Sequence, residues 1–254
     1  MKKISITLLV VLVTIFILVW LRPSKRRVID EVPNPIVVGT SADFPPMSFI
    51  KDSEIVGFDI DIIHEVAKRL GKEIVLKNMP FDVLLPQLQL GSLHVVAAGL
   101  TATDERAKQL NFSQPYLVND PLVIVTLKTK PAITDIKDIK GKEVLVNQGY
   151  TADAYISKID GVRVTRLGSL SDALLALTHN RGEVFVTALS TLKPVIEQYG
   201  PDAFHIFVIP ETGENTALGI TKSYAKLAQE IDHVLQTMQK DGTIELLKQK
   251  WHLT

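Results

Sequence analysis

Gly99, Thr101, Thr103 and Arg106 form the group of residues in this chain whose types and spacing best suit ligand chemistry. Gly99 lies near the end of an apolar run, Val95–Leu100, that has the composition and length of a strand, and the other three residues follow it. Thr103 precedes two acidic residues and is a good helix N-cap, which places Arg106 on the first helical turn. A strand end, a helix N-terminus and a guanidinium together can bind a carboxylate. The alternative interpretation is a surface turn with an exposed arginine.

The segments around this group alternate between strand and helix patterns. Short connections between them favour a parallel sheet with helices on both faces. Two stretches are expected to be irregular: residues 40–49, because Pro45 and Pro46 interrupt regular structure, and the polar residues 211–215. Residues 36–39 and 73–77 are predicted to be strands, and residues 57–71 and 81–90 to be helices.

Composition excludes several kinds of site. The chain of 254 residues contains no cysteine, which excludes disulfides, thiolate metal sites and cysteine nucleophiles. Its six histidines are widely spaced, and we expect no metal site and no cofactor. Residues 1–27 hold six basic residues and no acid, so the remainder has 22 basic against 28 acidic residues, a net charge of −6. An acidic body argues against a nucleic-acid-binding protein.

Residues 1–27 have the pattern of a targeting segment. Lys2 and Lys3 precede an apolar run at residues 4–21 that is just long enough to span a bilayer. No small-x-small cleavage pattern follows, which favours an uncleaved anchor over a cleaved signal peptide. The excess of positive charge after the run would by itself place the body in the cytoplasm. Residues 28–35 contain two prolines and are predicted to be a linker.

Residues 98–116, A-G-L-T-A-T-D-E-R-A-K-Q-L-N-F-S-Q-P-Y, resemble a signature of the periplasmic solute-binding proteins of polar amino-acid ABC importers, bacterial family 3. G-F-D-I-D at residues 57–61 and D-G-T-I-E-L-L-K-Q-K-W-H-L at residues 241–253 resemble the same family. The resemblance covers residue 36 to the end and is strongest to arginine- and glutamine-binding proteins. It implies export, to the periplasm or the cell surface.

The resemblance also implies the fold. Members of the family have an α/β, two-lobed periplasmic-binding-protein fold of type II, in which each lobe is a mainly parallel sheet flanked by helices. Two hinge strands join the lobes, and the ligand binds between them. On this basis we expect lobe 1 to comprise residues 36–119 plus 216–254, and lobe 2 to comprise residues 120–215.

Ligand-binding residues can be carried over from the family's motifs. The resemblance implies that Thr101 and Arg106 hold the ligand's carboxylate together with Thr151, which lies in the turn Q-G-Y-T. It implies that Phe44 and Phe81 flank the ligand side chain. The complete set expected from the resemblance is Ser41, Asp43, Phe44, Phe81, Gly99, Leu100, Thr101, Arg106, Gln148 and Thr151.

One position departs from the family pattern. Family members usually have an aspartate that pairs with the ligand's ammonium group at the end of a lobe 2 strand, where this chain has Ala188. A desolvated ammonium group without a charged partner is costly. Asp153, Glu211 and Glu214 are candidate substitutes, and the sequence does not choose among them.

The resemblance implies a binding protein that captures an amino acid and delivers it to an ABC permease. Two aromatic faces suit a planar guanidinium, so arginine is the first expected ligand and glutamine the second. An enzyme similar to cyclohexadienyl dehydratases is the main alternative, but it needs an acid or base in the cleft that the sequence does not single out. A surface sensor or adhesin with the same fold is a further alternative.

Overall fold

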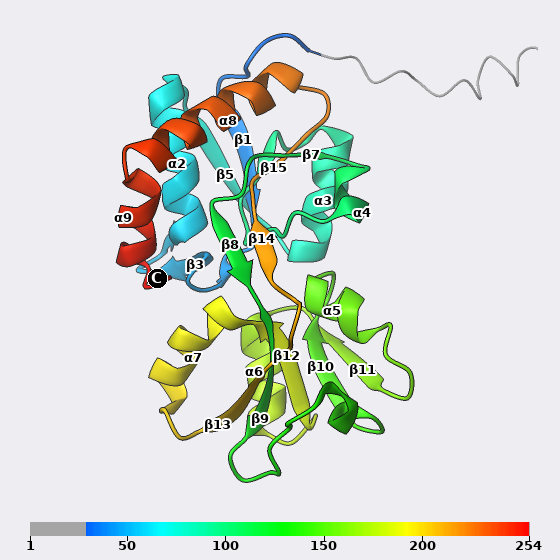
Figure 1. Cartoon of the computed structure of the whole chain (residues 1–254). Coiled ribbons are helices and arrows are strands. Elements are labelled where there is room, and N and C mark those ends of the chain that lie inside the picture. The colour runs from blue at the N-terminus through cyan, green and yellow to red at the C-terminus, as the bar shows by residue number, and fades with distance from the viewer. Residues whose placement is uncertain (1–28, 254) are drawn as a thin grey trace, which may run out of the picture.

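The computed structural model describes residues 29–253, which form two lobes joined by a pair of strands (Figure 1). Lobe 1 contains a five-stranded sheet in the order β5-β1-β6-β15-β7. β1 pairs in parallel with β5 and β6, whereas β15 is antiparallel to both β6 and β7. The strands are β1 (Ile36–Thr40), β5 (Ile74–Asn78), β6 (Val95–Val96), β7 (Asn111–Phe112) and β15 (Gly219–Ile220).

Lobe 2 repeats this plan with longer strands, in the order β11-β10-β12-β9-β13. β10 is parallel to β11 and β12, and β9 is antiparallel to β12 and β13. The predicted two-lobed α/β fold is therefore confirmed, but the sheets are mixed and not mainly parallel, because β15 and β9 each pair antiparallel with both of their neighbours. The strands are β9 (Leu122–Leu127), β10 (Glu143–Asn147), β11 (Arg163–Leu167), β12 (Val184–Ala188) and β13 (Phe204–Val208).

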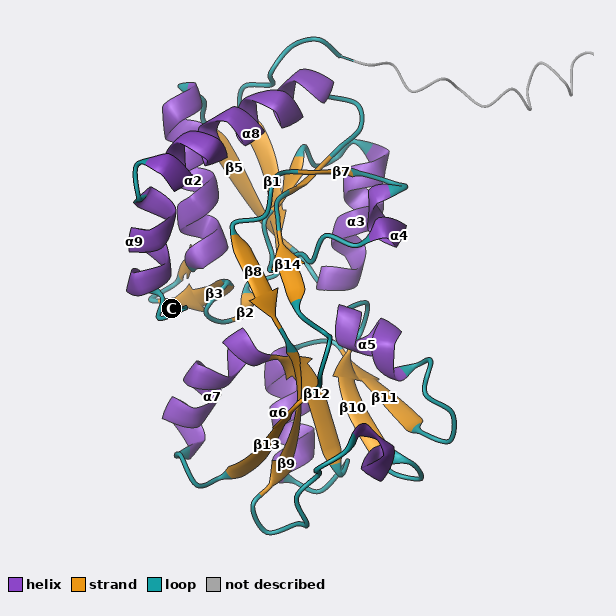
Figure 2. Cartoon of the chain, in the orientation of Figure 1, coloured by secondary structure: helices purple, strands orange, loops and turns teal. Residues whose placement is uncertain are grey.

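Helices cover both sheets, as Figure 2 shows. In lobe 1, α3 packs on β1 and β6, and α2, α8 and α9 pack on one another. In lobe 2, α6 packs on β9 to β12 and α5 packs on β10 and β12. The helices are α2 (Phe58–Leu70), α3 (Phe81–Leu90), α4 (Asp104–Ala107), α5 (Thr151–Ile156), α6 (Leu170–Thr178), α7 (Leu192–Tyr199), α8 (Ala225–Lys240) and α9 (Thr243–Lys250), with 3₁₀ turns at Ile136–Ile139 and Leu189–Thr191.

The connection between the lobes consists of β8 (Leu117–Asp120) and β14 (Glu214–Thr216), which pair antiparallel. β8 leads into β9, and β14 leads toward β15, so the chain crosses between lobes twice. Residues 211–215 were predicted to be a loop, which is wrong at its end because β14 begins at Glu214. The pairing with a strand some 95 residues earlier supplies hydrogen bonds that the local sequence does not reveal.

The predicted proline loop is also partly regular. β2 (Asp43–Phe44), β3 (Ser48–Lys51) and β4 (Glu54–Val56) form a small antiparallel sheet, with Pro45 and Pro46 in the turn between β2 and β3. The prolines therefore interrupt the strands without preventing them. This turn directs Phe44 into the interior, where its side chain is buried.

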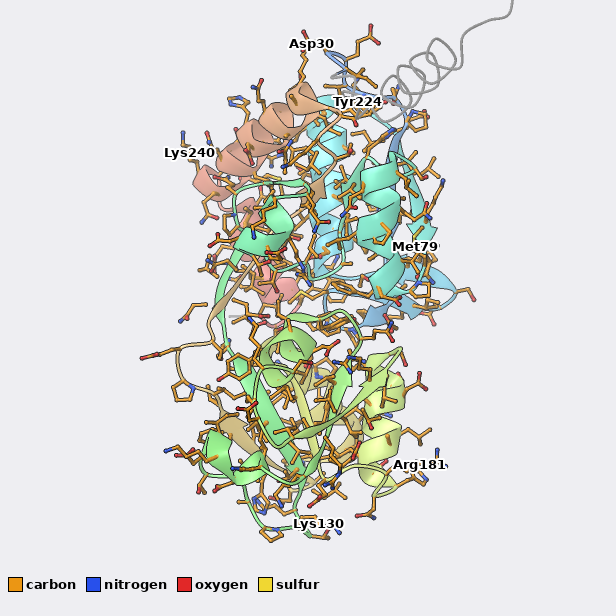
Figure 3. The ribbon with its side chains drawn as sticks, turned by 90° about the vertical axis from the view of Figure 1, so that its right-hand side faces the viewer. Asp30, Met79, Lys130, Arg181, Tyr224 and Lys240 are labelled. Carbon is orange, nitrogen blue, oxygen red and sulfur yellow. The ribbon has the colours of Figure 1, made fainter. Side chains whose placement is uncertain are left out.

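The side view in Figure 3 places Tyr224 and Lys240 in lobe 1 and Lys130 at the opposite end of the molecule. Within residues 29–253, no helix has both the length and the apolar character needed to cross a membrane. The predicted anchor at residues 4–21 lies outside the described residues. The lobe boundaries at residues 119–120 and 215–216 stay a prediction.

Candidate functional site

A cavity of about 20 Å³ lies between the lobes beside the hinge strands, a volume sufficient for about one water molecule. Residues of lobe 1, of the hinge and of lobe 2 all contribute to its lining. The structure therefore brings together side chains that are far apart in sequence. Six of the ten predicted binding residues line this cavity: Phe44, Phe81, Gly99, Thr101, Arg106 and Thr151.

Arg106 provides the positive charge of the cavity. Its position follows the prediction, because Thr103 is the N-cap of α4 and its hydroxyl accepts a hydrogen bond from the Arg106 N–H at 3.3 Å. The guanidinium donates to the Thr101 carbonyl at 2.9 Å and, across the cleft, to the Gly149 carbonyl at 3.1 Å. Burial lowers the pKa of Arg106, and the negative charge of Glu214 opposes this shift. With five N–H donors, the group retains donors for a ligand carboxylate.

Gly99 is fixed in a conformation that requires glycine. Its φ is +60°, and a Cβ there would lie 2.9 Å from the Phe44 ring. The buried carboxylate of Asp59, in the first turn of α2, accepts hydrogen bonds from the Gly99 N–H at 2.5 Å and from the Tyr116 hydroxyl at 2.9 Å. Burial raises the pKa of Asp59 to about 6. Asp59 thus anchors the segment that carries Thr101 and Arg106.

Three aromatic side chains meet at the cavity, one more than the sequence predicted. Phe44 and Phe81 both come from lobe 1, and Tyr150 of lobe 2 packs against each of them. Its ring centroid lies 5.1 Å from that of Phe44, in an edge-to-face contact, and 4.3 Å from that of Phe81. Arg106 lies over the Phe81 ring, 5.7 Å from the centroid. The two faces that were predicted to hold a ligand side chain are therefore in contact with Tyr150.

Two carboxylates on the hinge strands also line the cavity. Asp120 of β8 and Glu214 of β14 are direct partners in the antiparallel pairing of these strands. The Thr101 hydroxyl donates to Glu214 at 3.1 Å, and the Ser190 N–H donates to Asp120 at 3.0 Å. Burial raises the pKa of Asp120. Burial also raises the pKa of Glu214, the Thr151 and Thr101 hydroxyls lower it, and the charge of Asp120 raises it further.

Of the three residues proposed to substitute for an acid at position 188, the structure places only one at the cavity. Asp153 forms an ion pair with Arg166 at 3.0 Å, so its charge is already balanced. Glu211 is exposed and does not line the cavity. Glu214 does line it, together with Ala188 itself. Asp120 was not among the candidates, because no motif marks the segment N-D-P that contains it.

The remaining four predicted binding residues lie outside the lining of the cavity. The Ser41 hydroxyl donates to the Asp43 carboxylate at 2.7 Å, and burial raises the pKa of Asp43. Leu100 is fully buried in the core beneath α3. The Gln148 amide donates across the cleft to Asp82 at 2.9 Å. Within residues 29–253, no group of three or more His, Cys, Asp or Glu residues has the arrangement of a metal site.

Comparison with known families and proteins agrees with this architecture. Residues 36–254 match the profile of the bacterial extracellular solute-binding proteins, family 3. A probable histidine-binding protein of Campylobacter jejuni is 30% identical over 85% of this chain and 84% of its own length. The arginine-binding extracellular protein ArtP of Bacillus subtilis is 29% identical over 85% of both chains.

Solved structures give the same result. An ancestral arginine-binding protein bound to arginine is 34% identical and has a TM-score of 0.82, covering 87% of this chain and 99% of that one. An ancestral arginine-binding protein bound to glutamine, also 34% identical with the same coverage, has a TM-score of 0.81. Each of these relatives is named as a binding protein, and the prediction of a binding protein is confirmed.

Proposed function

The chain belongs to the bacterial extracellular solute-binding proteins, family 3, and on that premise we propose that it captures arginine outside the cytoplasmic membrane and delivers it to an ABC permease. It is an amino-acid-binding protein of an ABC transporter. Relatives named for arginine, and structures of an arginine-binding protein with arginine and with glutamine, support arginine as the first ligand and glutamine as the second.

The observation that carries this proposal is the charge pattern of the cavity. Arg106 lies on the lobe 1 side, and the carboxylates of Asp120 and Glu214 lie on the hinge. Opposite charges that line one small space suit an α-amino acid zwitterion, whose carboxylate and ammonium groups are both bonded to the α-carbon. We assign the carboxylate to Arg106, assisted by Thr101 and Thr151, whose hydroxyls would turn from Glu214 to donate to the ligand. The guanidinium can make two parallel hydrogen bonds to such a group.

The ligand side chain is assigned to the space bounded by Phe44 and Phe81. In the present arrangement Tyr150 contacts both rings, and a cavity of about 20 Å³ is too small for an arginine side chain. Binding of arginine therefore requires Tyr150 to withdraw, which an opening of the lobes at the hinge accomplishes.

The proposal extends to location and to the parts of the chain. The family is extracellular or periplasmic, and we assign residues 4–21 as the segment that holds the protein at the membrane. We place lobe 1 at residues 36–119 plus 216–254 and lobe 2 at residues 120–215. A linker at residues 28–35 then separates the binding lobes from the membrane.

A thermal-shift screen of the purified protein against the twenty amino acids tests the proposal. A ligand present at 100 times its Kd should add about 2.7 kcal/mol to the free energy of unfolding. We expect the largest shift with L-arginine and a smaller one with L-glutamine. If none of the twenty amino acids stabilises the protein, the proposed function is wrong.

A further inference from the structure

Any α-amino acid that enters this cavity brings an ammonium group, which needs a negatively charged partner when it is desolvated. The end of β12 does not provide one, because Ala188 is the last residue of that strand and lines the cavity without a charge. The partner must therefore come from the other groups that surround Ala188.

Asp120 is held beside Ala188 by the sheet of lobe 2. Ala188 pairs with Leu122 in the β9–β12 ladder, and the Leu189 N–H donates to the Pro121 carbonyl at 2.8 Å. One residue further along, the Ser190 N–H donates a hydrogen bond to the Asp120 carboxylate at 3.0 Å. The carboxylate of Asp120 therefore stands next to the position where a side chain at residue 188 would begin.

Glu214 provides a second carboxylate from the opposite hinge strand, since it is the direct partner of Asp120 across the ladder. Like charges directly opposite each other in a sheet are destabilising. Within residues 29–253, neither carboxylate is in an ion pair with Lys, Arg or His. Arg106 attracts Glu214 from a longer distance, so two adjacent carboxylates share one nearby cation, an arrangement that a further cation stabilises.

Ser190, which contacts Asp120 through its N–H, gives a further sign of a ligand at this place. It lines the same cavity, and its hydroxyl oxygen is buried without a hydrogen-bond partner in the described part of the chain. A buried hydroxyl without a partner is costly unless a bound group satisfies it. An ammonium group has three N–H donors, enough for both carboxylates and this oxygen.

We propose that Asp120 and Glu214 form the subsite for the ligand's α-ammonium group, in place of an acid at the end of β12. This inference rests on the proposed function, because it concerns the same amino acid in the same cavity. It assigns the recognition of the amino group to the hinge itself. The positive charge of the ligand then contacts both hinge strands, since the ammonium group bridges β8 and β14.

The test compares two ligands that differ only in the amino group: L-arginine and 5-guanidinopentanoate, which lacks it. Binding is measured by calorimetry on the parent protein and on Asp120→Asn. We expect the substitution to raise the Kd for L-arginine by more than tenfold. The Kd for 5-guanidinopentanoate should change by less than about threefold. Glu214→Gln gives the same comparison from the other strand, so the test does not depend on one variant remaining folded. Glu211→Gln, an exposed acid three residues away, is the matched control.

A rescue variant strengthens the assignment. Ala188→Asp in the Asp120→Asn background places a carboxylate on the neighbouring position, and recovery of L-arginine binding there supports the subsite. Suppose that the parent binds L-arginine but that Asp120→Asn and Glu214→Gln both leave the affinity for L-arginine unchanged, or lower the affinities for the two ligands equally. The subsite is then wrong, while the proposed function stands. If no amino acid in the thermal-shift screen stabilises the parent protein, the proposed function is wrong, and this inference is wrong with it.

Discussion

Replacing Tyr150 by threonine should tighten the binding of arginine. Tyr150 makes ring contacts with Phe44 and Phe81, at 5.1 and 4.3 Å between centroids. An aromatic pair contributes about 0.5–1.5 kcal/mol beyond its buried area, so both pairs together are worth about 1–3 kcal/mol. A ligand side chain that takes this space must first break these contacts. Without them, the Kd for L-arginine should fall by roughly 5- to 150-fold.

Calorimetry with two ligands makes this test specific. L-alanine has no side chain long enough to reach between Phe44 and Phe81, so Tyr150→Thr should change its affinity far less than that of L-arginine. Tyr199→Thr is the matched control, because it removes one aromatic contact in lobe 2, with Phe204, away from the cavity. If Tyr150→Thr instead raises the Kd for L-arginine by tenfold or more, Tyr150 contacts the ligand, and the inference that arginine displaces it is refuted.

Three further predictions concern lobe 1. Arg106→Ala should cost about 2–5 kcal/mol of arginine binding, because a buried carboxylate loses its countercharge; unchanged affinity by calorimetry would contradict the assignment. Phe44→Leu and Phe81→Leu should each reduce the preference for arginine over the neutral citrulline, by about 0.5–2 kcal/mol of cation–π contact per ring. Asp59→Asn should remove a pH dependence of stability. The pKa of Asp59 is about 6 in the folded protein, above its unfolded value. The folded state therefore binds more protons between these two values, and the free energy of unfolding falls as the pH rises through them. Urea titrations from pH 4 to pH 7 should show the parent losing on the order of 2–3 kcal/mol relative to Asp59→Asn; parallel profiles would show that Asp59 ionises normally.

The local parts of the site were predictable from the sequence. Thr103 and Arg106 are fixed relative to each other by one helical turn, and a threonine followed by two acids is a strong N-cap signal. Gly99 precedes them at a point where only a small residue leaves room for Phe44. The relation between Thr103 and Arg106 depends on neighbours within three residues, whereas the contact of Gly99 with Phe44 joins distant residues and was not predicted. The sequence pattern around Thr103 was therefore sufficient to predict the position of Arg106 on the first helical turn.

The parts that depend on pairing between distant strands were not predictable. Glu214 appeared to lie in a polar loop, and only its pairing with Asp120 makes it part of a strand and brings both acids to one cavity. Tyr150 appeared to be one residue in a turn before a short helix. Its partners belong to the other lobe, and which lobe 1 side chains it meets is decided by the closure of the hinge.

The contacts across the cleft have a consequence for the transport cycle. The Arg106 guanidinium donates to the Gly149 carbonyl and the Gln148 amide to Asp82, while Tyr150 packs on two rings of lobe 1. The Arg106 and Gln148 contacts join groups of the protein itself, so they stabilise the closed shape with or without cargo, and the Tyr150 contacts stabilise it only when arginine is absent. A permease that recognises only the closed shape would then spend ATP on deliveries without cargo. Faithful transport by such a pair requires the permease to test for the cargo as well as for closure.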